Sequence, residues 1–324
     1  MSPQERSSFA NGIWLCRRCH KIVDSDHSPF GAVTLRQWKQ DAEKQARKAV
    51  EFSESTAALP ALVSVLHKSM ENIPNGALRA SMPDVFAADS NLEVVVDACD
   101  LYSGGVMQNP LEAMQRQVDK RNELVEVLNT HQNIDVAYYG IAHVPLTFHL
   151  GFLLSTKISP HFAERERTAN EWRWLSNDDS SVEFQVTRPE GGWSGESDAA
   201  IRIGVSYPVT PEQTNPVVES CATFGISVVS PAVDIVRTRK DVERLAASFR
   251  GVIDELVASS SIQRIHVFAS VPMCVAFAMG QQISASIHPK VYVYNYRRQD
   301  SPNYKWGALM TDDTTAQDAI IINE

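Results

Sequence analysis

Two stretches of similar sequence decide the fold: IDVAYYGIAHVPLTFHLG at 134–151 and RIHVFASVPMCVAFAMG at 264–280. Each begins with a run of β-branched and aromatic residues that is typical of a buried strand. Each continues through an Ala-x-Val-Pro sequence into an apolar segment that carries a glycine, Gly151 or Gly280. Proline suits the first turn of a helix, because the N–H that it lacks would have no partner there. Both stretches therefore predict a strand, a turn and a helix.

Apolar runs and amphipathic segments alternate along the chain on both sides of these stretches. Short β-branched runs predict strands, and apolar positions at spacings of three and four residues predict helices. Strands are expected at 92–98, 134–140, 160–165, 201–209, 226–232, 264–270, 291–296 and 319–323, and helices at 110–131, 145–157, 239–259 and 272–286. This alternation is typical of Rossmann-like α/β layers.

The order of these elements occurs twice, which predicts a duplicated α/β body. The helix of each half is followed by an Ile-x-Pro sequence with a basic and an apolar residue after it, at 158–162 and at 287–291. Several matches in one order favour a duplication. Chance similarity between two generic strand–helix units is the alternative.

The domain boundaries follow from this repeat. We place the first subdomain at 91–198 and the second at 199–324. Serine, proline and asparagine are frequent at 53–90, which predicts a connector with one short helix near 57–70. Residues 1–52 form a separate N-terminal piece.

Charge divides the chain unequally. Residues 11–50 contain eight Lys and Arg against four Asp and Glu, a net charge of +4, while the whole chain carries −9. Since residues 1–10 are balanced, residues 51–324 carry −13. A basic segment attracts polyanions, whereas the acidic body is not expected to coat DNA.

Composition excludes several classes of protein. An apolar fraction of 44% and a charged fraction of 21% are ordinary for a globular chain and exclude collagen-like or low-complexity proteins. No apolar run reaches the ~18 residues of a membrane helix, and the polar start MSPQERSSFANG lacks the core of a signal peptide. Five cysteines, an odd number, do not suggest a disulfide framework. We therefore expect a cytoplasmic protein without a membrane partner.

The densest motif is Asn11-Gly-Ile-Trp-Leu-Cys16-Arg-Arg-Cys19-His20. Two thiolates at Cys-x-x-Cys spacing can bind one side of a tetrahedral zinc ion, so Cys16 and Cys19 are half of a zinc site. The motif resembles the second half of an HNH endonuclease, a ββα-metal nuclease that cuts double-stranded DNA. The resemblance implies that Asn11 orients the loop and that His20 ligates a catalytic Mg²⁺ or similar divalent metal.

The first half of the HNH pattern would lie upstream of Asn11, where only ten residues precede it. The first Cys pair and the Asp-His pair of the family have no counterpart there. We therefore expect a nuclease domain truncated at its N-terminus, unable to cut DNA. The alternative is that 1–30 is a remnant without function.

The duplicated body at about 90–324 resembles the SAVED domain, a fusion of two CARF-like Rossmann subdomains. The strand–Ala-x-x-Pro–helix–Gly elements and the tyrosine-rich strand at 291–296 carry this resemblance. Together with the HNH motif, it implies an HNH–SAVED effector of bacterial CBASS anti-phage defence. In that family a cyclic oligonucleotide binds the sensor, and the protein forms a homo-oligomer, a dimer or tetramer, that degrades DNA. A cyclic dinucleotide such as cyclic GMP-AMP is the favoured activating ligand.

Ligands of open α/β sheets gather outside the carboxyl ends of the strands. Two such ends lead into helix N-termini, whose free N–H groups favour phosphate. Facing each other, they would hold the two phosphates of a cyclic dinucleotide. The candidate contacts at the two turns are His143, Val144, Pro145, Ala269, Ser270 and Pro272.

The bases of such a ligand need aromatic faces, worth ~1–3 kcal/mol for each stacked base. The candidates are two pairs that follow the helices, Trp172 with Trp174 and Tyr304 with Trp306. The candidates for charge neutralisation are Arg165, Arg167, Lys290, Arg297, Arg298 and Lys305. For each aromatic residue, a place in the core is the alternative.

Two other functions compete with a sensor. A Rossmann-like hydrolase or ring nuclease would act on the cyclic nucleotide itself, although the chain has neither a G-x-S-x-G nor a G-x-G-x-x-G sequence. A plain DNA-binding module would use the basic segment at 11–50.

Overall fold

The computed structural model describes residues 23, 31–40, 43, 61–73, 81–83, 86, 91–131, 134–166, 171–180, 182–190, 192–193, 195–218, 221–258 and 261–323. The chain divides into two compact units, Met1–Pro60 with Asp84–Ser90, and Ala61–Pro83 with Asn91–Glu324. In the first unit, residues 32–40 are helical. All elements discussed below belong to the second unit.

The first sheet of this unit has five strands in the order β2-β1-β5-β6-β7. All neighbours are parallel except β6 and β7. Its elements are β1 (Ala61–Lys68), β2 (Asn91–Asp97), α5 (Pro110–Thr130), β5 (Ile134–Ile141), α6 (Val144–Leu154), β6 (His161–Glu166) and β7 (Glu171–Trp174). A short turn η3 (Cys99–Leu101) and a hairpin of β3 (Tyr102–Ser103) and β4 (Val106–Met107) precede α5.

The second sheet has seven strands in the order β14-β13-β12-β11-β9-β10-β8. Its central strands β10, β9, β11 and β12 are parallel. Its elements are β8 (Phe184–Thr187), β9 (Asp198–Gly204), α7 (Pro211–Thr214), β10 (Ala222–Val228), α8 (Arg239–Ala258), β11 (Arg264–Ser270), α9 (Met273–Gly280), β12 (Lys290–Asn295), β13 (Trp306–Leu309) and β14 (Ile320–Ile322).

The two sheets repeat one design. The order β2-β1-β5-β6-β7 matches β10-β9-β11-β12-β13, and in both the last strand alone is antiparallel. The helices occur at the same points of the chain, α5 and α8 after the second strand and α6 and α9 after the third. Strands β8 and β14 extend the second sheet at its edges. The topology agrees with the duplicated α/β body that the sequence predicts.

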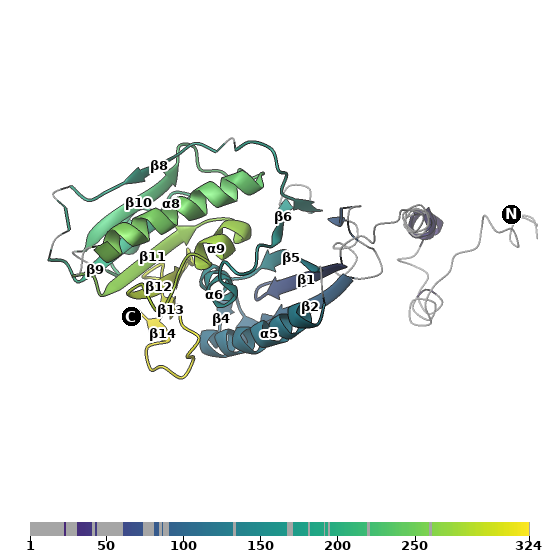
Figure 1. Ribbon diagram of the computed structural model, residues 1–324, viewed down its shortest axis with the longest axis horizontal. Coiled ribbons are helices and arrows are strands. Elements are labelled where there is room, and N and C mark those ends of the chain that lie inside the picture. Colours follow the sequence, from purple (N-terminus) through teal and green to yellow (C-terminus); the bar gives the residue numbers. More distant parts are fainter. Residues whose placement is uncertain are drawn as a thin grey trace, which may run out of the picture. The chain divides into compact units, whose positions relative to one another are not determined.

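The two halves join through α6 and α9, which lie between the sheets (Figure 1). A Cβ atom at Gly151 would lie 2.1 Å from the Phe277 carbonyl oxygen, and one at Gly280 would lie 2.1 Å from that of Phe148. Only glycine allows the two backbones to approach this closely. Because the contact is reciprocal, the glycine that each quoted stretch contains serves the partner helix.

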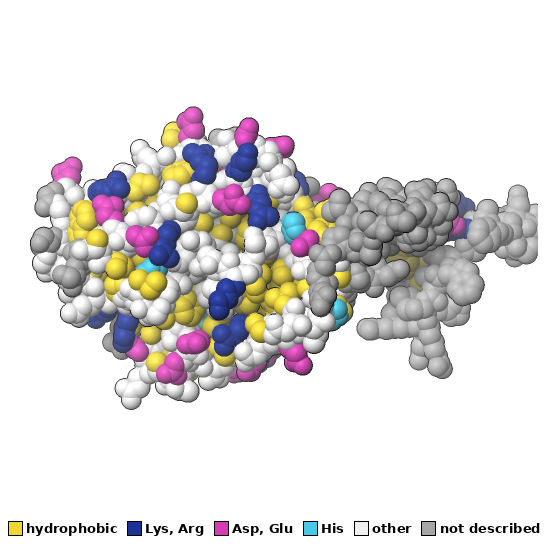
Figure 2. Space-filling view, viewed as in Figure 1, with side chains coloured by type: hydrophobic (Ala, Val, Ile, Leu, Met, Phe, Trp, Pro, Cys, Tyr) yellow, Lys and Arg dark blue, Asp and Glu magenta, His cyan; other side chains and the backbone are white. Residues whose placement is uncertain are grey.

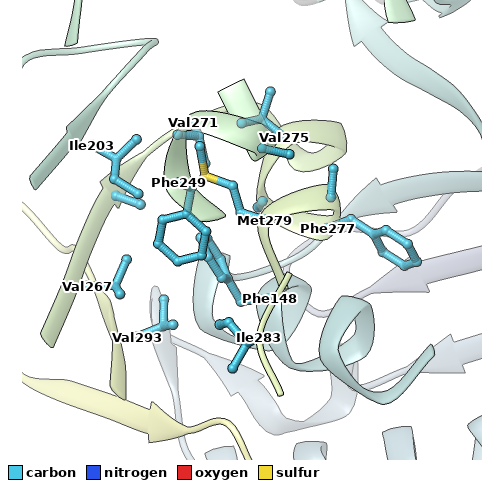
Figure 3. Packing of buried hydrophobic residues seen from close by; sticks show 14 of the residues in the cluster. Phe148, Ile203, Phe249, Val267, Val271, Val275, Phe277, Met279, Ile283 and Val293 are labelled. Atoms are coloured by element: carbon cyan, nitrogen blue, oxygen red, sulfur yellow. The ribbon is translucent and has the colours of Figure 1, made fainter. Parts of the chain in front are cut away.

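Two phenylalanines cross this junction in opposite directions, as Figure 3 shows. Phe148 of α6 packs against Phe249 of α8, with ring centroids 5.8 Å apart. Phe277 of α9 packs against Tyr138 of β5, at 4.4 Å. Both phenylalanines are fully buried. Each half therefore completes the core of the other.

Several sequence expectations need correction. The helix expected near 57–70 is wrong, because Ala61–Lys68 is the central strand β1 of the first sheet. Its six middle residues are all buried, as in a strand covered on both faces, and such a short apolar run lacks the alternation that marks a strand. The segment 53–90 is therefore not only a connector, and the first half begins at β1 rather than at 91.

The other differences concern ends and edges. Helix α9 stops at Gly280, before the expected end at 286. Strands β7, β8 and β13 were not expected, and β8 pairs with β10 of the second sheet although it lies within the proposed first subdomain at 91–198. Each of these three strands has only four residues, too few to establish an alternating pattern in the local sequence.

Candidate functional site

A pocket of about 660 Å³ opens where strands of both halves reach their carboxyl ends. The first half contributes the segments after β1 and β5 and the end of β6, and the second half contributes the turns after β9 and β11. This is the place where α/β sheets bind ligands. The lining residues are Met70, Glu71, Tyr102, Gly140, Ile141, Glu164, Arg165, Glu166, Arg173, Ser206, Val233, Asp234, Val236, Val271, Pro272 and Met273.

The same backbone arrangement shapes the floor of the pocket in both halves. The carbonyl of Ile141, the last residue of β5, accepts the N–H groups of Ser69 and Met70 at 3.0 and 3.4 Å. The carbonyl of Ser270, the last residue of β11, accepts those of Val205 and Ser206, both at 2.9 Å. These bonds end the strand pairing and turn the chains apart, which leaves space at the strand ends.

Four carboxylates and two arginines line the pocket. The Arg165 guanidinium lies 2.7 Å from a Glu71 oxygen, and this bond lowers the pKa of that carboxyl group. Arg173 differs, since its Nε atom is buried and no hydrogen bond or ion pair joins it to another residue in the described part of the chain. Arg173 is thus a cation in a pocket without a fixed counter-charge.

The N-terminus of α9 opens into the pocket, with Pro272 as its N-cap. The N–H of Cys274, the second residue of the helix, donates to Glu164 Oε1 at 2.5 Å. Glu164 comes from β6 of the other half, so its carboxylate takes the place at the helix dipole where an anion binds well. The anion position at the start of α9 is therefore occupied by a side chain of the protein, the Glu164 carboxylate.

The N-terminus of α6 is closed. Its N-cap His143 is buried, and its backbone N–H donates to Ser69 Oγ at 2.9 Å. The Ser69 hydroxyl lies 2.8 Å from His143 Nδ1 and can donate to it, because the same oxygen accepts the backbone N–H. Burial lowers the pKa of His143 to about 4, so the ring is neutral near pH 7. The rings of Tyr102 and Trp306 flank the imidazole at centroid distances of 5.3 and 6.1 Å.

The family is shown by comparison of the sequence with family models. Residues 117–310 match the model of SAVED, the SMODS-associated and fused to various effectors sensor domain. This chain belongs to the SAVED family. The match begins within α5 and runs through the rest of the first half and most of the second, including α6, α9 and the ends of β5, β6, β9 and β11 beside the pocket. No curated protein matches the chain.

Solved structures of SAVED receptors resemble this chain. The Acinetobacter baumannii Cap4 SAVED/CARF-domain containing receptor with the cyclic trinucleotide 2'3'3'-cAAA has 10% identity and a TM-score of 0.50, over 88% of this chain and 60% of that one. The same receptor with 3'3'3'-cAAA has 12% identity and a TM-score of 0.47, over 86% and 63%. The Moraxella osloensis Cap4 receptor has 11% identity and a TM-score of 0.46, over 79% and 52%. The first likeness shows a shared fold, and this SAVED chain spans 60% of that receptor's length.

The turn residues predicted to contact ligand divide between pocket and core. Pro272 lines the pocket, whereas Ala269 is buried in β11. The Ser270 carbonyl accepts the backbone N–H groups of Val205 and Ser206. Val144 and Pro145 form the first turn of the closed helix α6. The two prolines of the sequence match are not equivalent, because Pro145 is the second residue of α6 while Pro272 precedes α9.

The four predicted base-stacking residues lie outside the pocket lining. Trp172 packs edge-on against Tyr139, and Trp174 Nε1 donates to the Tyr139 hydroxyl at 3.0 Å. Tyr304 is buried against Phe268, and Trp306 lies beside His143 in the main core. In the SAVED fold of this chain, these rings belong to the packing of the two sheets.

Of the remaining predicted residues in the described part of the chain, Arg165 lines the pocket, whereas the pocket lining does not include Lys290, Arg297, Arg298 and Lys305. Lys305 is exposed, and its carbonyl accepts the N–H of Asn323. Arg167 lies outside the described residues, as do Asn11, Cys16, Cys19 and His20 of the HNH-like motif. Within the described ranges, no group of three His, Cys, Asp or Glu side chains could hold a metal ion.

The sequence interpretation missed Glu164, Arg173 and Tyr102. The run Glu164–Arg167 resembles a solvated strand face, and the Tyr102–Gly105 segment is too short for a phosphate loop. Pairing across β6 and β7 sets Glu164 opposite Arg173, and both line the pocket. The local sequence does not report that pairing, because the four residues of β7 are too few to predict a strand.

Two global properties bear on partners. In the described part of the chain, no helix is long and apolar enough to cross a membrane. Figure 2 shows basic and acidic side chains interspersed on one face of the molecule. Such a mixed face lacks the single-sign charge that attracts a nucleic acid duplex.

Proposed function

We propose that this SAVED chain is the sensor part of an anti-phage effector and binds a cyclic oligonucleotide in the pocket between its two halves. The observation that supports this proposal is the pocket itself, about 660 Å³ at strand ends of both halves, with a helix N-terminus and with Arg173, whose buried Nε has no hydrogen-bond partner among the described residues. Its volume lies in the range of small-molecule sites, roughly 300–1,000 Å³. The sensor role of the family and the cyclic trinucleotides of the Acinetobacter receptor support this choice of ligand.

A cyclic dinucleotide such as cyclic GMP-AMP is the first candidate ligand. Two arginines line the pocket, Arg173 and the Glu71-paired Arg165, and a cyclic dinucleotide has two phosphates. Tyr102 is the aromatic residue among the described lining residues and offers a face for one base. In this proposal Tyr102 replaces Trp172, Trp174, Tyr304 and Trp306 as the stacking surface.

Calorimetry against a panel of cyclic di- and trinucleotides tests the proposal. We expect one member of the panel to bind with a stoichiometry of one per chain, and to lose most of its affinity in an Arg173→Gln variant. If no member of the panel binds, the proposed sensor function is wrong. Chromatography of the ligand after incubation separates a sensor, which returns it intact, from a hydrolase or ring nuclease.

The effector role is a further part of the proposal. We propose that ligand binding drives formation of a homo-oligomer and that Asn11, Cys16, Cys19 and His20 derive from an HNH nuclease. Plasmid cleavage by the purified chain with Mg²⁺ tests the nuclease part of the proposal, and light scattering with and without ligand measures the oligomer.

A further inference from the structure

Glu164 occupies an unusual place among the pocket residues. It belongs to β6 in the first half, yet its carboxylate accepts the Cys274 N–H at the start of α9 in the second half. The Cys274 side chain is fully buried beside it, and burial together with this carboxylate raises the pKa of the thiol. The contact therefore links the two halves at the edge of the pocket.

Arg173 is the residue directly opposite Glu164 in the antiparallel pair of β6 and β7. Side chains at opposite positions of such a pair lie close together, and a carboxylate and a guanidinium there normally form an ion pair. Here Glu164 binds the helix end instead, and the buried Nε of Arg173 has no partner among the described residues. An unsatisfied buried donor is costly, so Arg173 is ready to receive an anion.

We infer that Glu164 is an internal competitor that sets the affinity of the pocket for its ligand. In the empty pocket its carboxylate holds the anion position at α9. When a phosphate takes that position, Glu164 turns to Arg173 across the strand pair. A guanidinium has five N–H groups, so Arg173 can hold this carboxylate and still contact the phosphate.

The exchange has a structural consequence. The bond between Glu164 and Cys274 is one of the connections between the halves, and a ligand that displaces it loosens β6 from α9. For the cyclic oligonucleotide this inference rests on the proposed function. For a simple phosphate anion it rests on the geometry alone, which allows the two to be tested separately.

The first experiment follows the Cys274 amide directly, with inorganic pyrophosphate as the probe. Isotope labelling of cysteine nitrogen gives an NMR spectrum with one signal for each of the five cysteines, and Cys274→Ser identifies the signal of interest. Glu164→Gln removes the competing charge, while Glu166→Gln removes an equal charge from the same strand and the same pocket. Circular dichroism checks that each variant is folded.

The expected result is a shift of the Cys274 signal in Glu164→Gln before any probe is added, because the amide loses a charged acceptor. Pyrophosphate then binds Glu164→Gln about tenfold more tightly than the unmodified chain, the gain expected from removing one charge-assisted hydrogen bond. Glu166→Gln gains less affinity than Glu164→Gln, because it removes a lining charge but frees no N–H at the start of α9. Equal affinities in Glu164→Gln and Glu166→Gln would overturn the inference.

If Glu164→Gln fails to fold, Glu164→Asp replaces it. The shorter side chain keeps the charge but no longer reaches α9, so it also should bind pyrophosphate more tightly. Unchanged binding in a folded Glu164→Asp variant would count against the competitor role.

The second experiment repeats the comparison with the panel of cyclic di- and trinucleotides. Tighter binding of one member to Glu164→Gln supports both proposals. If pyrophosphate binds more tightly to Glu164→Gln but no cyclic oligonucleotide binds either protein, the proposed function fails and the inference about Glu164 stands.

Discussion

The two N-termini of α6 and α9 occupy the same position in the two halves, yet one is closed and the other is open. The second helical residue is Cys274 in α9 and Pro145 in α6. Cys274 presents an N–H that needs a partner and finds Glu164, whereas Pro145 has no N–H to satisfy. A duplicated fold thus provides two potential anion positions, and this chain keeps one.

The strands beside the two helix N-termini also differ, because charged residues lie beside α9 and an aromatic residue lies beside α6. Register counted outward from β5 and β11 places the pair Glu164 and Arg173 of the first sheet where the second sheet has Asn295 and Trp306. The carboxylate and guanidinium line a pocket, while the indole of Trp306 packs against His143 and fills the equivalent space. Charge marks the open end, and aromatic packing marks the closed one.

The largest effects are expected where the halves meet. Gly151→Ala and Gly280→Ala each place a Cβ atom 2.1 Å from a backbone carbonyl oxygen that cannot move freely. Each should lower the free energy of unfolding by about 3 kcal/mol or more, and by similar amounts because the contact is reciprocal. Urea denaturation measures both.

Gly251→Ala is the matched control. Gly251 is exposed within α8, and an added Cβ would meet nothing within 4 Å. Alanine there should raise the stability by about 0.5–1 kcal/mol. Loss of stability in this variant as large as in Gly280→Ala would show that the α6–α9 contact is not special.

The closed end should depend on pH. The pKa of His143 lies at about 4 in the folded protein, against 6.5 for the free side chain. The unfolded chain therefore binds more protons between these values, and stability is lost as the pH falls from 6.5 towards 4. At a pH midway between the two pKa values, the contribution of His143 to the loss of stability is roughly 2 kcal/mol. Urea denaturation across this range, with His143→Asn, measures it.

His67 and His149 titrate in the same direction, since burial lowers their pKa values to about 3 and 4. The His143→Asn variant should therefore reduce the pH dependence without abolishing it. An unchanged pH dependence would mean that His143 is not shielded from water by Tyr102 and Trp306.

The open end should depend on its arginine. Among the described lining residues, Arg173 is the cation without a fixed counter-charge, so Arg173→Gln should weaken binding of the cyclic oligonucleotide about tenfold, measured by calorimetry. Arg188→Gln is the control, because Arg188 pairs with Glu255 and lies outside the pocket lining. Equal affinities of the two variants would move the binding site elsewhere.

The smallest effect is expected at Pro145. Pro145→Ala gives α6 the N–H that α9 already has at Cys274, but the helix end stays covered by His143 and Trp306. The affinity for the ligand should change by less than about twofold in calorimetry, because no anion can reach the new donor. A second binding event would show that His143 and Trp306 move aside and expose the N-terminus of α6.

The sequence predicts the α/β class, most helices and the buried strands, because strong apolar runs and helical periodicity are local properties. It misplaces β1, whose fully buried run has no alternation, and misses β7 and β13, which have only four residues each. The pairs Trp172–Trp174 and Tyr304–Trp306 look equivalent in sequence. They differ by one residue in register, which turns their rings to opposite faces of the two sheets.

The candidate site divides in the same way. The turns that lead into α6 and α9 were predicted, and Pro272 lies in the pocket. The sequence could not separate the open end from the closed one, because that difference depends on Glu164 and Trp306, which belong to other strands. Pairing across β6–β7 and β12–β13 decides which residue faces which helix.

The crossing of Phe148 and Phe277 between the halves has a practical consequence for building chimeras. A recombination point placed between the two repeats would separate each phenylalanine from the core that it fills, and each glycine from the backbone that it admits. Exchange of sensor specificity between relatives is better attempted by transplanting α6 and α9 together, as a single cassette, or by changing the strand ends alone. The unit that can be exchanged between relatives is therefore the pair of helices α6 and α9, and not the single repeat.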